Sequence, residues 1–132
     1  MLHPNQFEVN EAWVAFRLNK APIHIERDGD FNCIALMDAA SCYILGSELI
    51  PVVTATKRTQ GHARRLLKNA ERHKQQRPKT LFVPRGDLVD LVTREAARQH
   101  IDVVPVAETE LLVFIGGARQ EFAERFDCPA LV

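Results

Sequence analysis

The stretch that decides the fold is FNCIALMDAASCYILGSELIPVV, residues 31–53. Two apolar runs flank a short polar tip, Asp38-Ala39-Ala40-Ser41, whose aspartate and serine favour turns because their side chains bond nearby backbone groups. We therefore predict a hairpin of two antiparallel strands joined at this tip. Both faces of the strands are largely apolar, so we expect both to be covered. Gly46, inside the second run, predicts a bulge or a close backbone approach.

Upstream of the hairpin, residues 1–10 read as a poorly structured lead-in to the domain. Residues 12–18 alternate apolar side chains on one face and therefore predict a first strand. Pro22 ends that strand because proline cannot donate to a ladder, and residues 23–25 are a short extension. The turn signal Asp28-Gly29-Asp30 then leads into the hairpin.

Downstream of the hairpin, helices and strands alternate. Residues 57–76 predict a helix, and its apolar stripe is formed by Ala63, Leu66, Leu67 and Ala70. Residues 81–83 predict a short buried strand. We expect Asp87 to be the N-cap of the next helix, with His100 near its end.

The last part of the chain predicts one strand and one helix. Residues 103–106 read as a strand at a sheet edge, since Pro105 removes a backbone donor. Apolar residues from Thr109 to Phe126 keep helical spacing. Gly116-Gly117 interrupts them and costs about 1 kcal/mol per glycine relative to alanine, so we expect a weak or kinked middle.

The composition is that of a globular protein with one domain. The chain has 132 residues, of which 46% are hydrophobic and 26% charged, and a formal net charge of zero. Cys33, Cys42 and Cys128 form no CxxC pair and leave one thiol unmatched in any disulfide scheme. The sequence shows neither a signal peptide nor an apolar run of about 18 residues. We therefore expect a cytoplasmic protein with reduced cysteines and no contact with membranes.

The charge is strongly segregated along the chain. Residues 57–79 contain nine basic and one acidic residue, for a net of +8, whereas residues 1–56 and residues 80–132 each carry −4. One interpretation is a phosphate-binding surface, formed by Arg58, Arg64, Arg65, Lys68, Arg72, Lys74 and Arg77. The other is a solvated helix face that meets acidic segments of its own chain, of a twin subunit or of another protein. The second is favoured because the segment lacks aromatic side chains for base stacking.

Short motifs for metals, cofactors and nucleophiles are incomplete. Residues 28–32 begin like a calcium loop, but Cys33 and Ala39 occupy the positions that need glycine and a bidentate glutamate. The five histidines have no HExxH or CxxC spacing. Gly116-Gly117 has no phosphate-loop context, and Ser41 and Cys42 have no neighbouring base. We therefore expect no metal site and no cofactor.

The predicted order of elements, β-β-β-α-β-α-β-α, resembles the ribonuclease H-like fold of ribonuclease H and of transposase and integrase cores. FNCIALMDAASCYILGSELIP is similar to the hairpin of integrase cores, and KTLFVPRGDLVDLVTREAARQHIDVV to the strand, helix and strand that follow it. The resemblance spans roughly residues 12–126 and implies a mixed α/β sheet. The chain is also similar to bacterial proteins without an assigned activity.

The resemblance implies three acids in an active enzyme of this kind: one in the first strand, one near the end of the fourth strand and one on a late helix. They would converge because two Mg²⁺ ions about 3.5–4 Å apart clamp the reacting oxygens. The first strand offers only Ala15 or Phe16 at its position. The second position falls near Pro84, with Asp87 beyond it. Only Glu121 or Glu124 matches the third.

We rank three functions from these observations. The first is a non-catalytic binding or interaction module, and a homo-oligomer is compatible with it. The second is a nucleic-acid-binding protein that uses the basic helix. The third is a divergent metal-dependent nuclease, which requires Asp38, Asp87 and either Glu121 or Glu124 to converge.

Overall fold

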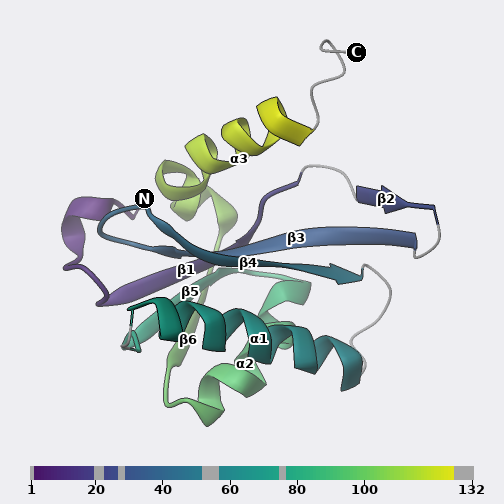
Figure 1. Cartoon of the computed structure of the whole chain (residues 1–132). Helices are drawn as coiled ribbons and strands as arrows, with labels where there is room; N and C mark the ends of the chain where they lie inside the picture. Colours follow the sequence, from purple (N-terminus) through teal and green to yellow (C-terminus); the bar gives the residue numbers. More distant parts are fainter. Residues whose placement is uncertain (1, 20–22, 27–28, 52–56, 75–76, 127–132) are drawn as a thin grey trace.

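The computed structural model describes residues 2–19, 23–26, 29–51, 57–74 and 77–126. It contains a mixed sheet packed between helices (Figure 1). The elements in chain order are η1 (Pro4–Gln6), β1 (Ala12–Arg17), β2 (Ile23–Ile25), β3 (Gly29–Asp38), β4 (Ile44–Pro51), α1 (Lys57–Lys74), β5 (Thr80–Pro84), α2 (Asp87–Arg98), β6 (Asp102–Val106), η2 (Glu108–Leu111) and α3 (Leu112–Phe126). The predicted break at Pro22, residues 52–53 of the predicted hairpin, Asp28, Gln75-Gln76 and Cys128 lie outside the described residues.

Strand β3 lies inside the sheet. It pairs antiparallel with β1 and with β4, and β1 and β5 pair parallel, as do β5 and β6. Phe31 of β3 pairs with both Ile23 and Pro51, so β2 and β4 lie on opposite edges of β3. Strand β1 also pairs with the edge of β3 that lies opposite β4. Strands β1 and β2 therefore lie one after the other along the same edge of β3. Within the described chain, β6 pairs only with β5, which confirms the predicted edge strand.

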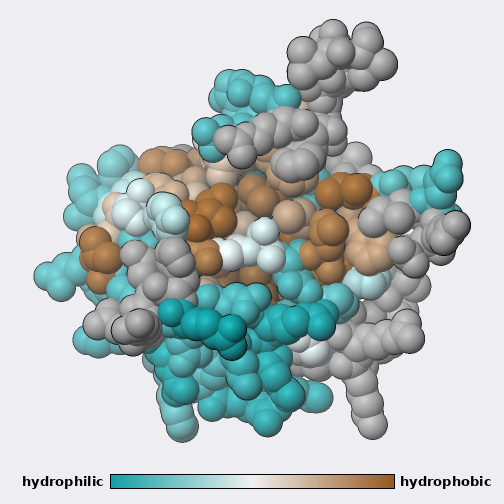
Figure 2. Space-filling model, in the orientation of Figure 1, coloured by the Kyte–Doolittle hydropathy of each residue, from teal (hydrophilic) through white to brown (hydrophobic). Residues whose placement is uncertain are grey.

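The predicted hairpin is confirmed, and so is its irregularity. The register shifts between Leu36, which pairs with Gly46, and Met37, which pairs with Ile44. Leu45 is therefore the extra residue of a bulge. The prediction that both hairpin faces are covered is wrong for β4, because this edge strand leaves Ile44 and Leu49 exposed. Figure 2 shows hydrophobic surface on this side of the molecule, above the hydrophilic surface of α1.

Two hydrophobic clusters hold the layers together, and Figure 1 shows α1 and α2 on one side of the sheet and α3 on the other. Alternation along β1 places Trp13 and Ala15 toward α1 and α2, and Val14 and Phe16 toward α3. The first cluster is completed from the helices by Leu66, Leu67, Ala70, Val92 and Ala96. The second is completed by Leu111, Phe114 and Ile115.

Residues 2–10, which the sequence predicts to be a poorly structured lead-in, contact the folded core. Phe7 packs on the α3 side of the sheet, and its ring lies 5.6 Å from that of Phe82 in an edge-on arrangement. The backbone N–H of Asn10 donates to Asp38 Oδ1 at 2.7 Å, and Asn10 Oδ1 accepts from the indole of Trp13 at 2.8 Å. These contacts tie the start of β1 to the hairpin tip.

The start of α2 corrects one expectation. The N-cap of α2 is Gly86, not Asp87, and its φ of 134° lies where residues with a Cβ are strained. Asp87 is therefore the first residue of the helix and not its N-cap. Helix α3 runs from Leu112 to Phe126 as one α-helix through Gly116-Gly117, and both glycines are exposed.

Candidate functional site

Helix α1 presents three distinct surfaces. Its inward surface is the predicted apolar stripe, and all four of its residues are buried. One flank faces β4 and carries His62 and Arg65. The other flank faces α2 and carries Arg64, Lys68 and Arg72, which follow the four-residue spacing of one helix face.

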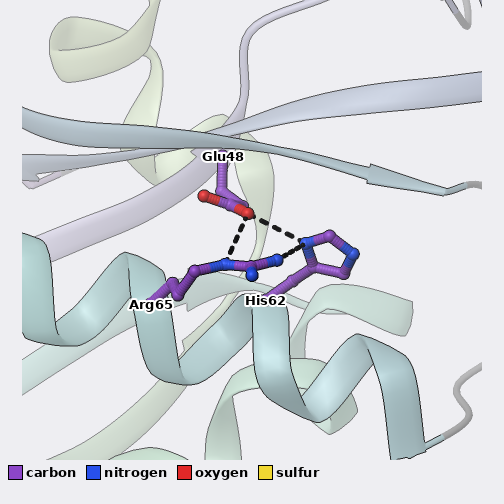
Figure 3. Close-up of polar contacts among 3 residues, drawn as sticks. All are labelled: Glu48, His62 and Arg65. Carbon is purple, nitrogen blue, oxygen red and sulfur yellow. Dashed lines mark hydrogen bonds and ion pairs between the residues drawn. The ribbon is translucent and has the colours of Figure 1, made fainter.

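On the β4 flank, Glu48 holds both basic residues (Figure 3). Glu48 Oε1 accepts from Arg65 Nε at 3.1 Å and lies 2.9 Å from His62 Nδ1, while Arg65 Nη2 lies 2.9 Å from that same ring nitrogen. His62 Nδ1 can accept from Arg65 or donate to Glu48, but not both at once. The side chain of Glu48 is only 18% exposed. This flank is therefore an internally paired cluster.

On the α2 flank, basic side chains surround an open groove of about 790 Å³. Helix α1 forms one wall, the end of α2 forms the other, and Arg77 lies in the connection that follows α1. Among the described residues, the lining contains five basic and two acidic side chains, for a net charge of +3. The lining residues are Arg64, Lys68, Glu71, Arg72, Arg77, Glu95, Arg98 and Gln99.

Glu95 is the buried acid of this groove. Its side chain is 6% exposed, and its Oε2 lies 3.6 Å from Arg64 Nε and 3.8 Å from Arg98 Nη1. Gln99 Nε2 donates to Glu95 Oε1 at 3.2 Å. One carboxylate thus joins an arginine of α1 to an arginine of α2.

Two further lining residues leave the groove positively charged. Arg77 forms an ion pair with Glu71, and its Nη1 donates to the backbone oxygen of Gln99 at 3.4 Å. In the part of the chain that the structure describes, Lys68 and Arg72 form no ion pair, and both are exposed. Lys68 and Arg72, in the second half of α1, therefore carry two of the three excess charges, and the third remains because Arg64 and Arg98 share the single carboxylate of Glu95.

The structure divides the seven predicted phosphate-binding residues. It brings together Arg64, Lys68, Arg72 and Arg77 in the groove. Arg65 does not belong with them, because it lies on the opposite flank with Glu48. Arg58 and Lys74 lie at the two ends of α1, and their side chains are outside the described part of the structure.

Sequence reasoning missed the contribution of α2. Glu95, Arg98 and Gln99 line the groove although they lie far from the basic segment. The only available signal was the three- and four-residue spacing of these polar residues on one helix face. Which neighbour that face meets depends on tertiary packing and cannot be read from the spacing.

The first-strand positions where the resemblance implies a catalytic acid contain other residues. Ala15 and Phe16 are fully buried on opposite faces of β1. At the end of β1, Arg119 of α3 donates from Nε to the backbone oxygen of Arg17 at 2.8 Å and forms an ion pair with Glu108. At this end of the sheet, the carboxylate of Glu108 is thus paired with Arg119.

Asp38 lies at the other end of the sheet. It pairs with Trp13, three residues before Phe16, which corresponds to about 10 Å along the strand. Its carboxylate is buried and accepts from the backbone of Asn10 and from both the N–H and the hydroxyl of Ser41, at 2.7–3.0 Å. The predicted turn role of Asp38 is confirmed. Asp38 lies level with the start of β5, whereas position 87 follows the end of that strand.

No group of three or more His, Cys, Asp or Glu side chains that could hold a metal ion occurs among the residues described by the structure. Glu121 and Glu124 are exposed on α3, and Gln120 donates to Glu124 at 3.4 Å. The convergence required by a divergent nuclease is therefore not seen in the described side chains.

The thiols of both described cysteines have raised pKa values. Burial raises the pKa of the Cys33 thiol, a hydrogen bond with Ser47 opposes that rise, and the charge of Glu48 adds to it. Burial also raises the pKa of Cys42, with a further contribution from Asp38. Both thiols are free, and the raised pKa values disfavour the thiolate form that acts as a nucleophile.

Comparison with known proteins shows a similar fold but does not assign the chain to a family. No protein-family model and no curated protein matches the chain. A solved structure of the HTLV-2 integrase catalytic core domain, in complex with magnesium in a dimeric form, aligns with a TM-score of 0.50 at 12% identity. The chain has an integrase-core-like fold. The alignment covers 93% of this chain and 76% of the integrase chain, and it confirms the predicted resemblance at the level of the fold.

The described helices are also too short or too polar to cross a membrane.

Proposed function

We propose that this chain is a non-catalytic nucleic-acid-binding module and that the groove between α1 and α2 contacts phosphate groups. The observation that carries the proposal is the uncompensated positive charge of the groove, where Lys68 and Arg72 have no acidic partner in the described structure. A surface that neutralises phosphates releases condensed counterions, and this release favours binding.

The chemistry of the lining favours phosphate as the ligand group. Of its basic residues, all but Lys68 are arginines, whose planar guanidinium groups match phosphate oxygens in a bidentate manner. Among its described residues, the lining contains no aromatic side chain on which a base could stack. We therefore expect contacts with the phosphate backbone and little dependence on base sequence.

The non-catalytic part of the proposal is supported by the end of the sheet. Ala15 and Phe16 supply no carboxylate, and Arg119 with Glu108 forms an internal pair there. A two-metal mechanism needs acidic ligands at these positions. We therefore assign binding to the groove and no hydrolysis to the end of the sheet.

A fluorescence anisotropy titration tests the proposal. Single-stranded DNA and RNA of equal length are titrated with the full chain at about 50 mM and about 200 mM salt. Two phosphate contacts give a slope of roughly 1.4 log units of affinity per log unit of salt, or about a sevenfold loss over this range. Binding that is negligible at low salt, or that does not change with salt, contradicts the proposal. Equal binding of a poly-glutamate peptide would point instead to an acidic protein partner.

A further inference from the structure

We infer that the groove selects a terminal phosphate monoester at the end of a nucleic-acid strand over the internal phosphodiesters of the backbone. This inference rests on the proposed nucleic-acid-binding function. It concerns which phosphate is bound and how the arginines are oriented toward it.

The basic residues of the groove are not confined to the row of Arg64, Lys68 and Arg72 along α1. Basic side chains reach one concavity from α1, from the end of α2 and from Arg77. Outside it, the neighbouring cation of α1, Arg65, is already held by Glu48. A continuous strand is better served by a row of cations along its path. A concavity of about 790 Å³ is instead within the usual range of small-molecule sites, about 300–1,000 Å³.

A terminal phosphate suits such a concavity better than an internal one. A phosphate monoester carries a charge of about −1.5 to −2 near pH 7 and three acceptor oxygens. An internal diester carries one charge and has only two free oxygens. Several guanidinium groups that line one groove therefore gain more from the monoester than from the diester.

Glu95 supplies the second line of argument. A buried carboxylate in the lining of a cationic groove weakens attraction for any polyanion, since it lowers the net charge of the lining. Its position between Arg64 and Arg98 gives it a different role, which is to fix the two guanidinium groups across the groove. Gln99 holds the other carboxylate oxygen. We assign Glu95 as a positioning residue for terminal-phosphate recognition.

The test compares strands that differ only at their ends. Oligonucleotides of one sequence, labelled at the opposite end, carry either a terminal phosphate or a terminal hydroxyl, and the 5′ and 3′ ends are tested separately. We expect the phosphorylated strand to bind about tenfold more tightly at one end or both, the value of one added charge-assisted contact. Equal affinity for phosphorylated and unphosphorylated strands overturns this inference but leaves the proposed function standing. Absence of binding to every strand overturns both.

Glu95→Gln separates positioning from charge. The substitution raises the net charge of the lining from +3 to +4, so affinity for unphosphorylated strands should rise by a few fold. The preference for the terminal phosphate should fall to less than about threefold, because Arg64 and Arg98 lose their common anchor. An unchanged preference in the variant overturns the role of Glu95.

Two further variants provide an alternative test and a matched control for this result. If Glu95→Gln unfolds the chain, Arg98→Gln removes one of the two arginines and should also reduce the preference. Arg94→Gln is the matched control, since Arg94 is an exposed arginine of α2 that does not line the groove. It should leave both affinity and preference unchanged, and a loss equal to that of Arg98→Gln overturns the assignment to the groove.

Discussion

The two flanks of α1 carry similar basic side chains but differ in how their charge is balanced. Toward β4, His62 and Arg65 share the single carboxylate of Glu48. Toward α2, Glu71 and Glu95 neutralise only part of the positive charge. Lys68 and Arg72 remain without an acidic partner among the described residues. The same helix thus presents a structural cluster on one side and a binding surface on the other.

The difference shows that charge counted along the sequence is a poor guide to available charge. The segment 57–79 has a net charge of +8, yet its basic residues Arg64, Arg65 and Arg77 all meet acids of the folded chain. Two of these acids, Glu48 and Glu95, lie outside the segment. What remains for a ligand is the local excess of the α2 flank.

The largest expected effect comes from the face that both flanks share. Leu67→Ala removes a fully buried side chain between α1 and the sheet, and it should lower the free energy of unfolding by about 2–5 kcal/mol. Chemical denaturation measures this change. A loss below about 1 kcal/mol would mean that α1 is not held by this face, and the comparison of its flanks would lose its basis.

The next effect concerns the α2 flank alone. The double substitution Lys68→Ala and Arg72→Ala should weaken nucleic-acid binding about 100-fold, at about tenfold for each phosphate contact, with little change in stability. Anisotropy titrations at a fixed salt concentration measure the loss. Arg65→Ala is the matched control from the β4 flank and should change affinity less than about threefold. If the double variant and Arg65→Ala lost affinity equally, the two flanks would not differ in their contribution to binding.

The smallest effect concerns the β4 flank. Glu48→Gln removes the charge shared by His62 and Arg65 but keeps the shape of the side chain. Since Arg65 is largely exposed, we expect the free energy of unfolding to fall by at most about 1 kcal/mol. Affinity for nucleic acid should not fall, as Glu48 does not line the groove. A large loss of affinity in this variant would show that the β4 flank takes part in binding.

Local patterns of sequence predicted the fold well. The hairpin tip at Asp38, the irregularity near Gly46, the apolar stripe of α1 and the edge position of β6 are all confirmed. Each depends on residues close together in the chain. The predictions that failed depend on a neighbour: β4 leaves Leu49 exposed because it lies at a sheet edge, a position that alternation along the strand cannot reveal.

The sequence predicted the basic residues that line the candidate site from α1, but not the residues that line it from α2. The four-residue spacing of Arg64, Lys68 and Arg72 was visible in the sequence, but the wall formed by Glu95 and Arg98 was not. The sequence did not show that Arg65 lies on the other flank of α1, because its partner, Glu48, comes from a strand and lies 17 residues earlier. Side-chain pairing across elements is decided by packing, and one sequence does not encode it in a readable pattern.

The most direct test of the account is an NMR titration of the ¹⁵N-labelled chain with a short single-stranded oligonucleotide. Chemical shift changes should centre on the α2 flank, at Arg64, Lys68 and Arg72, and on residues 95–99 of α2. Glu48 and the end of the sheet near Arg17 should be unaffected. Changes centred on Arg17 and Arg119, at the end of the sheet, would contradict the account, because they would place binding where integrase-like chemistry was expected and not in the groove.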